Sequence, residues 1–213
     1  MSPVKTHPRA LDLVNPRRAW FTELCRYTNI PSWDDYRARY FAAQCTFNVI
    51  VEHEPERAFM EIEWCLLRQP FRHRWTQWDH VLQHMPKDEW GAILDYGCGT
   101  GEMLTWLKRR RPIWLCNGID LDSPQLAYAR WRGFGASHPH HRYDVVTCYE
   151  TLEHLPNPVR AVEEMLEYLR PGGVLLWDFI DDYEGGNVAT REARREVLRM
   201  LGGTTGQREM YRA

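Results

Sequence analysis

The chain has 213 residues, with 27 Lys and Arg against 29 Asp and Glu and a net charge of -2. This near-balance of charge provides no overall positive field for nucleic acid, so nucleic-acid binding is not favoured. Hydrophobic residues make up 44% of the chain, enough for one α/β core, but no apolar run approaches the roughly 18 residues of a membrane span, which predicts a cytoplasmic protein.

Residues 1–88 are predicted to form an aromatic-rich helical part. A serine followed three residues later by an acid, at 32–35, is typical of a capping box that opens a helix. Pro55 is expected to start a second helix, and the aromatic and apolar spacing over 75–85 predicts a third. The only composition typical of a strand in this part is at 47–51.

An apolar run that ends in an acid and three alternating glycines follows this part. Its sequence is Ile93-Leu94-Asp95-Tyr96-Gly97-Cys98-Gly99-Thr100-Gly101. The run predicts a buried strand, and glycines at alternate positions allow a sharp turn in which backbone lies close to a ligand. Apolar residues with helical spacing come next. The predicted order of strand, loop and helix is that of a nucleotide-binding sheet. The spacing differs from the G-x-G-x-x-G that holds a pyrophosphate.

Similar units continue downstream. A second strand over 114–119 ends in Asp120, and Ser123-Pro124 is a helix-opening pair. A third strand is predicted over 143–149, and a helix opens at Asn157-Pro158.

The chain is then expected to complete its sheet and end. The sequence L-R-P-G-G-V-L-L at 169–176 leads into a strand predicted over 173–180, and a helix is predicted over 190–201. Residues 206–212 supply at most one further strand.

In this order the motifs over residues 90–180 resemble those of the class I S-adenosylmethionine-dependent methyltransferases, especially the small-molecule members. The resemblance implies an α/β fold with a three-layer Rossmann-like sheet. It further implies that residues 89–213 form the cofactor-binding core. Residues 1–88 are then expected to form an N-terminal helical cap or lid, which forms one wall of the acceptor pocket. The absence of an Asn/Asp-Pro-Pro-aromatic tetrad after the third predicted strand argues against nucleic-acid amino-methyltransferases.

The resemblance also assigns roles at the cofactor, S-adenosylmethionine, whose product is S-adenosylhomocysteine. Asp95 is expected to bind the methionine ammonium, the glycine loop to face the amino-acid part and sulfur, and Asp120 to hold the ribose. The predicted cofactor-binding residues are Asp95, Gly97, Cys98, Gly99, Gly101, Asp120, Leu121 and Tyr149.

The predicted acceptor side is the segment after the third strand, with Glu150, Glu153 and His154 as catalytic candidates. His154 has the pKa range of a general base for a hydroxyl nucleophile. The E-x-x-E-H pattern also resembles the metal-binding segment of small-RNA 2′-O-methyltransferases and occurs in ubiquinone-pathway O-methyltransferases. A metal-assisted enzyme acting on a diol, phenol or RNA 2′-hydroxyl is therefore an alternative, although no metal ligand is assigned.

Two features depart from the family pattern. The short connection 133–142 contains no acid, so either a strand is vestigial there or adenine is held by backbone and apolar contacts. The short C-terminal end predicts a sheet shortened at its edges, and an unpaired edge favours a homodimer. A non-catalytic, cofactor-binding partner subunit is a further alternative.

Overall fold

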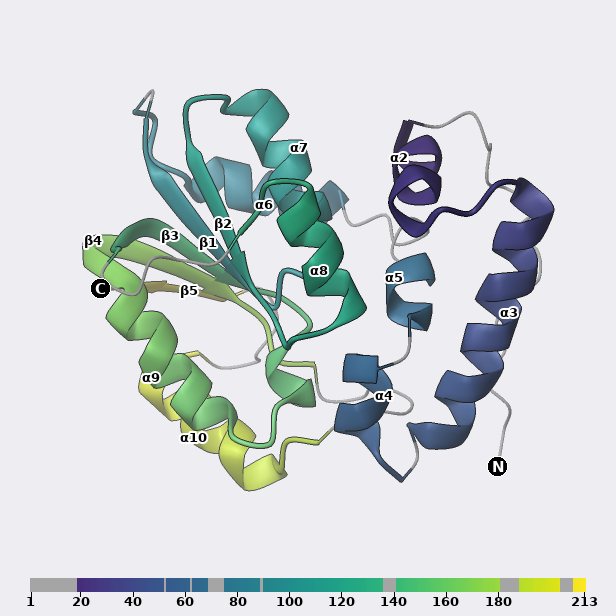
Figure 1. The fold of residues 1–213 in the computed structure, drawn as a ribbon. Coiled ribbons are helices and arrows are strands. Elements are labelled where there is room, and N and C mark those ends of the chain that lie inside the picture. Colours follow the sequence, from purple (N-terminus) through teal and green to yellow (C-terminus); the bar gives the residue numbers. More distant parts are fainter. Residues whose placement is uncertain are drawn as a thin grey trace. The chain divides into compact units, whose positions relative to one another are not determined.

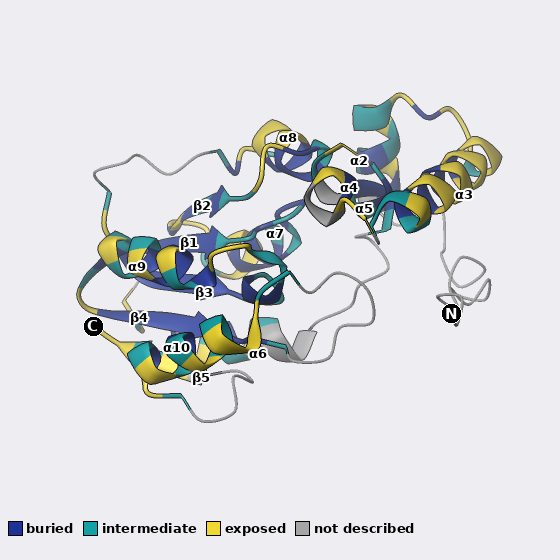
Figure 2. Cartoon of the chain, turned by 90° about the horizontal axis from the view of Figure 1, so that it is seen from below, coloured by how far each residue is buried: buried dark blue, intermediate teal, exposed yellow. Residues whose placement is uncertain are grey.

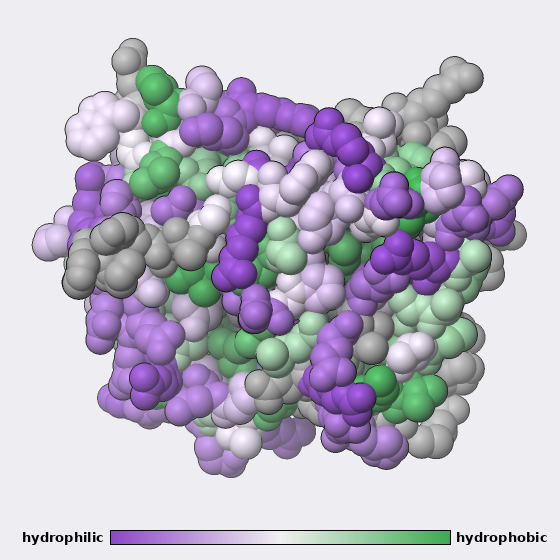
Figure 3. All heavy atoms as spheres, in the orientation of Figure 1, coloured by the Kyte–Doolittle hydropathy of each residue, from purple (hydrophilic) through white to green (hydrophobic). Residues whose placement is uncertain are grey.

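The computed structural model contains two compact units, Met1–His73 and Arg74–Ala213 (Figure 1). The described residues are 19–51, 53–61, 63–68, 75–88, 90–135, 141–180, 188–203 and 209–213. Within them, no helix has both the length and the apolar composition that crossing a membrane requires. Figure 3 shows hydrophilic side chains spread among apolar ones over the visible face.

The first unit is helical, as predicted. Its helices are α2 (Ala19–Thr28), α3 (Trp33–Ile50), α4 (Pro55–Glu61) and α5 (Trp64–Arg68). Ser32 caps helix α3, because its hydroxyl accepts a hydrogen bond from the Asp35 amide at 3.1 Å and donates one to the Asp35 carboxylate at 2.5 Å. The Tyr36 hydroxyl donates to the Leu67 carbonyl at 2.5 Å and joins α3 to α5.

The strand-like composition at 47–51 does not correspond to a strand, because this segment forms the end of helix α3. The buried residues of α3 include Tyr36, Tyr40, Ala43 and Phe47, whose spacing continues the helical period through the segment. Phe47 packs on Trp64 with ring centroids 4.4 Å apart. Tertiary packing of this stripe therefore overrides the local β-propensity of the β-branched residues.

The second unit is a sheet between two layers of helices. In chain order its elements are α6 (Trp75–His84), β1 (Ala92–Tyr96), α7 (Glu102–Arg110), β2 (Leu115–Ile119), α8 (Pro124–Trp131), β3 (Tyr143–Cys148), the short helix η2 (Leu152–His154), α9 (Pro158–Tyr168), β4 (Leu169–Trp177), α10 (Arg191–Leu201) and β5 (Glu209–Arg212). The five described strands lie in the order β2-β1-β3-β4-β5. The first four are parallel and β5 is antiparallel to β4. The predicted three-layer α/β fold is confirmed.

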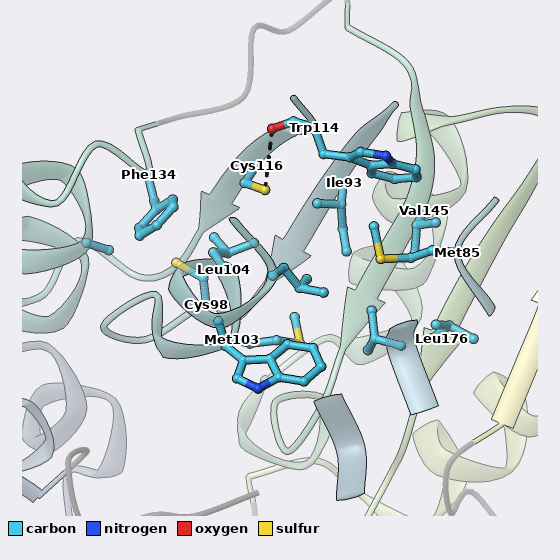
Figure 4. Close-up of a cluster of buried hydrophobic side chains, with 14 of the residues drawn as sticks. Met85, Ile93, Cys98, Met103, Leu104, Trp114, Cys116, Phe134, Val145 and Leu176 are labelled. Atoms are coloured by element: carbon cyan, nitrogen blue, oxygen red, sulfur yellow. Dashed lines mark hydrogen bonds between the residues drawn. The ribbon is translucent and has the colours of Figure 1, made fainter. Parts of the chain in front are cut away.

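Both faces of the sheet are buried, as a parallel sheet requires (Figure 2). Ile93 belongs to a core cluster with residues of α6, α7 and α8, which Figure 4 shows, whereas Leu94 belongs to a second cluster with residues of α9 and α10. The alternation of neighbouring side chains along β1 thus supplies both cores.

The sheet edges agree in part with the predictions. The C-terminal segment supplies one strand, β5, and residues 204–208 lie outside the described part of the chain. In the connection 133–142, neither 133–135 nor 141–142 is a strand, and 136–140 are likewise outside the described residues. Strand β4 begins at Leu169, before the predicted start at 173, and its register with β3 shifts between Tyr143 and Val145.

At the amino ends of the strands, Asp144 joins three of them. Its buried carboxylate accepts a hydrogen bond from the Ala92 amide of β1 at 2.8 Å and pairs with the Arg170 guanidinium of β4. These contacts offset the free-energy cost of removing the Asp144 carboxylate from water.

Helix α6 belongs to the second unit, so the division at 73/74 differs from the predicted boundary at 88/89. Val81 and Met85 are buried in the first core cluster. Trp78 lies against Trp106 of α7, with ring centroids 5.8 Å apart. The third predicted helix therefore packs on the sheet through these side chains.

This division predicts different outcomes for two truncations. Removal of residues 1–73 leaves both core clusters of the sheet intact, because all their members lie in the second unit. Removal of residues 1–87 also deletes Val81 and Met85, and each lost core side chain is worth roughly 2–5 kcal/mol. We expect the first fragment to unfold cooperatively on heating, and the second to show a much lower melting temperature or none. Equal stability of the two fragments would contradict this assignment.

Candidate functional site

The candidate site lies at the carboxyl ends of the parallel strands. Asp95 is near the end of β1, Asp120 follows β2, Tyr149 follows β3 and Asp178 follows β4. Because these strands are parallel, their carboxyl ends share one edge of the sheet, which is where ligands bind in open α/β sheets. The structure thus brings three of the predicted residues to one edge and adds Asp178, which the sequence had not singled out.

The loop after β1 needs its glycines. Gly97, Gly99 and Gly101 have φ values of +83°, +53° and +74°, in the left-handed region that favours glycine. A Cβ at Gly97 would lie 2.0 Å from the Thr151 hydroxyl oxygen, and one at Gly101 would lie 2.8 Å from the Phe134 ring. Close packing on neighbouring segments, as well as the turn, therefore excludes a side chain.

Several loop amides are already used within the protein. The Gly97 and Cys98 amides donate to the Ile119 carbonyl of β2 at 2.8 and 3.0 Å. The Gly99 amide donates to Asp120 Oδ2 at 2.6 Å. These bonds hold the loop against the end of β2.

Asp95 is a buried carboxyl group with few compensating contacts. Its Oδ1 accepts a hydrogen bond from the Thr147 hydroxyl of β3 at 2.8 Å. Burial raises the pKa of Asp95 to about 7, the nearby Asp120 charge adds to this rise, and the Thr147 bond opposes it. A positively charged partner would favour the ionised form of this carboxyl group.

Asp120 has a similar character at the end of the next strand. Its two oxygens accept hydrogen bonds from the amides of Gly99 at 2.6 Å and Leu121 at 2.8 Å. Burial raises the pKa of Asp120 to about 6, although both hydrogen bonds act in the opposite direction. The Leu121 side chain is exposed beside it.

The loop is also fastened from helix α8, by a residue that the sequence did not indicate. The Arg132 side chain is 3% exposed, and its guanidinium donates to the Thr100 carbonyl at 3.0 Å and to Glu102 at 2.7 Å. The Thr100 hydroxyl is buried and has no hydrogen-bond partner among the described residues. A ligand with polar groups therefore fits this loop, since it would supply what the hydroxyl lacks.

Cys98 has a packing role within the same loop. Its side chain is buried against Gly118 of β2, where a Cβ would lie 2.5 Å from the Cys98 sulfur. Burial raises the pKa of the Cys98 thiol well above its ordinary value, so the thiol stays protonated.

The segment after β3 is held in an unusual conformation. Glu150 has a φ of +49°, and its amide donates to Asp178 Oδ1 at 2.6 Å. The Thr151 hydroxyl donates to the Tyr149 carbonyl at 3.0 Å. A non-glycine residue in the left-handed region is strained, and such strain persists where surrounding contacts enforce it, commonly at functional sites.

The three predicted catalytic residues are placed unequally. Glu153 and His154 lie in the short helix η2, and Glu150 precedes it. The Glu153 side chain is fully buried, whereas those of Glu150 and His154 are half-buried. His154 Nε2 lies 3.9 Å from Glu153 Oε1. In the part of the chain that the structure describes, no three His, Cys, Asp or Glu residues are grouped to hold a metal ion.

Two residues that contact the site, Thr147 and Asp178, could have been recognised from the sequence. Thr147 is a polar residue within an otherwise apolar strand, close to the strand's end, and Asp178 is an acid directly after a buried strand. The sequence gave no indication of the role of Arg132, because a cationic side chain at a helix C-terminus is ordinarily exposed to solvent.

Comparison with known proteins gives a family for this site. A family model described as a methyltransferase domain matches residues 69–201. The ubiquinone biosynthesis O-methyltransferase of Saccharophagus degradans is 30% identical over 125 residues, which are 51% of this chain and 52% of that protein. The chain thus spans about half the length of the curated relatives that it matches.

Two solved structures are similar to parts of this chain. The [4+2]-cyclase SpnF is 26% identical, with a TM-score of 0.46, and the likeness covers 61% of this chain and 59% of that one. The S-adenosylmethionine-bound amino pentose methyltransferase CalS10 of Micromonospora echinaspora is 32% identical, with a TM-score of 0.38, covering 50% of this chain and 52% of that one.

The family model covers more than half of the chain and includes every site residue described above. The chain belongs to this methyltransferase domain family, the class I enzymes that use S-adenosylmethionine.

Proposed function

We propose that this chain transfers the methyl group of S-adenosylmethionine to an oxygen or nitrogen nucleophile of a small-molecule acceptor. The observation that supports this most is the pair of carboxyl groups, Asp95 and Asp120, on either side of the glycine loop at one sheet edge. Burial of both groups opposes folding, and such groups with perturbed pKa values are characteristic of binding sites. In the proposal Asp95 binds the methionine ammonium and Asp120 the ribose hydroxyls.

The cofactor, when bound, supplies an electrophilic methyl group, and the chain's residues supply position. Thr147 holds the Asp95 carboxylate, while Arg132 holds the loop that follows it. Fixed positions of this kind favour an in-line displacement, because the reacting atoms need no further ordering. Exclusion of water from the site adds to this effect.

On the acceptor side, His154 is the proposed general base and Glu150 its neighbour at the acceptor. Glu153 is too deeply buried to reach an acceptor, and its position 3.9 Å from His154 suits a role in orienting that ring. Several relatives are named ubiquinone biosynthesis O-methyltransferases, which favours a phenol or diol oxygen as nucleophile.

The cofactor assignment predicts the effect of removing one carboxylate. Asp120→Ala should weaken S-adenosylhomocysteine binding by about 1.5–3 kcal/mol, the range for lost hydrogen bonds to a charged group. The matched control is Asp122→Ala, which removes an exposed acid two residues away that pairs with Arg130 at 3.2 Å. Titration calorimetry should show a loss for the first variant only. Unchanged affinity in Asp120→Ala would exclude it as the ribose ligand.

The raised pKa of Asp95 predicts opposite effects of pH on stability and on binding. The folded chain holds this proton more tightly than the unfolded chain, whose carboxyl has an ordinary pKa of 3.8. The stability that protonation contributes is therefore lost as the pH rises through about 7. Binding of an ammonium group requires the carboxylate, so S-adenosylhomocysteine affinity should rise over the same interval.

Asp95→Asn provides the control for this second prediction. Melting temperatures and calorimetric affinities, measured between about pH 5 and 8, should depend on pH less in this variant than in the wild type. The remaining dependence should lie near pH 6, where Asp120 titrates. If the variant reproduced the wild-type pH dependence, Asp95 would not be the group responsible.

The acceptor-side assignment predicts a loss of turnover without a loss of cofactor binding. With a catechol as acceptor, His154→Ala should lower methyl transfer roughly 100-fold or more and leave S-adenosylhomocysteine affinity nearly intact. In the metal-assisted alternative, a chelator abolishes wild-type transfer and a divalent ion restores it. Cofactor binding with no transfer to any phenol, diol or amine would favour the non-catalytic partner subunit.

A further inference from the structure

A contact between helix α6 and the segment after β3 has no role in the assignments above. His80 Nδ1 lies 2.9 Å from the phenol oxygen of Tyr149, which is a hydrogen-bond distance. Both side chains are half-buried. The contact joins residues that are far apart in the sequence but belong to the same unit, so it is a product of the fold.

His80 is held in place by the packing of α6. Val81, the next residue, is buried in the first core cluster, and Trp78 lies on Trp106. The His84 ring lies 4.3 Å from the His80 ring, and its Nδ1 is 2.9 Å from the His80 carbonyl oxygen. The His80 imidazole therefore projects from a part of α6 that packing holds in place.

Tyr149 is held equally firmly. Its carbonyl accepts the Thr151 hydroxyl, and the amide of the next residue is bonded to Asp178. Its ring packs against the core cluster on the sheet face that α6, α7 and α8 cover. With the backbone and ring held in this way, the bond to His80 helps to set the direction of the phenol hydroxyl.

The position of Tyr149 relates it to Asp95. Thr147, whose hydroxyl is bonded to Asp95, and Tyr149 are two residues apart and so lie on the same side of the chain. Two extended residues advance the chain by about 6–7 Å, so Tyr149 lies about that distance beyond Thr147, just after the end of β3. The methionine part of the cofactor has two cationic groups, the ammonium and the sulfonium, joined by a short carbon chain. With the ammonium at Asp95, the sulfonium comes within reach of Tyr149.

We propose that the Tyr149 phenol oxygen contacts the sulfonium methyl group and recognises its positive charge, with His80 as the positioning residue. The inference rests on the proposed function, because it takes Asp95 as the ammonium ligand. An oxygen lone pair attracts the polarised C–H groups of a sulfonium methyl, and an aromatic ring attracts a cation. The product S-adenosylhomocysteine is a neutral thioether, so the pair favours the substrate cofactor over the product.

The test is the ratio of two dissociation constants, that of S-adenosylhomocysteine over that of S-adenosylmethionine, measured by calorimetry without an acceptor. Tyr149→Phe and His80→Ala should each lower this ratio roughly fivefold while changing S-adenosylhomocysteine affinity less than about twofold. His80→Asn should keep the wild-type ratio, because its amide group can occupy the place of Nδ1. Gln83→Ala, an exposed change on the same helix, is the control for a general disturbance of α6.

Several results would overturn the proposal. One is an unchanged ratio in both Tyr149→Phe and His80→Ala, and another is an equal loss of both ligands, which would show that the pair only supports packing. An unchanged ratio in Tyr149→Phe with a lowered ratio in Tyr149→Ala would assign recognition to the ring and leave His80 without this role. Failure of the wild-type protein to bind either ligand would instead contradict the cofactor assignment.

Discussion

The central position of β1 is the constraint on which the site depends. This strand pairs in parallel with β2 on one side and β3 on the other, and its register places Asp95 opposite both Gly118 and Thr147. Gly118 leaves room for the Cys98 side chain, and Thr147 supplies a hydroxyl to the carboxylate. A shift of one residue in either pairing would turn Asp95 away from these partners, because neighbouring side chains point to opposite faces.

Local sequence predicted most of the strands and helix starts in the second unit. The acids at the ends of β1 and β2, the N-caps at Ser123 and Asn157, and the single C-terminal strand were expected, because each depends on nearby residues alone. The strand-like composition at 47–51 did not predict the observed helix, because that helix packs through Phe47 on a partner in another helix.

The site was less predictable than the fold. Glu153 and His154 lie in one short helix, but the spacing of the three candidates gave no sign that Glu153 would face the interior. The roles of the loop amides depended on the position of the Ile119 carbonyl, which belongs to another strand. Likewise, no local pattern relates Arg132 to Thr100. Contacts between distant segments decided each of these features, and periodicity does not report them.

The close approach of Gly97 to Thr151 has a consequence for the divergence of this domain. The space that a side chain at 97 would need is filled by the Thr151 side chain, so the first loop and the segment after β3 interlock. A change of residue type at one position is compatible with the fold only if the other position makes room for it. These two segments, one at the proposed cofactor side and one at the proposed acceptor side, are therefore obliged to evolve together.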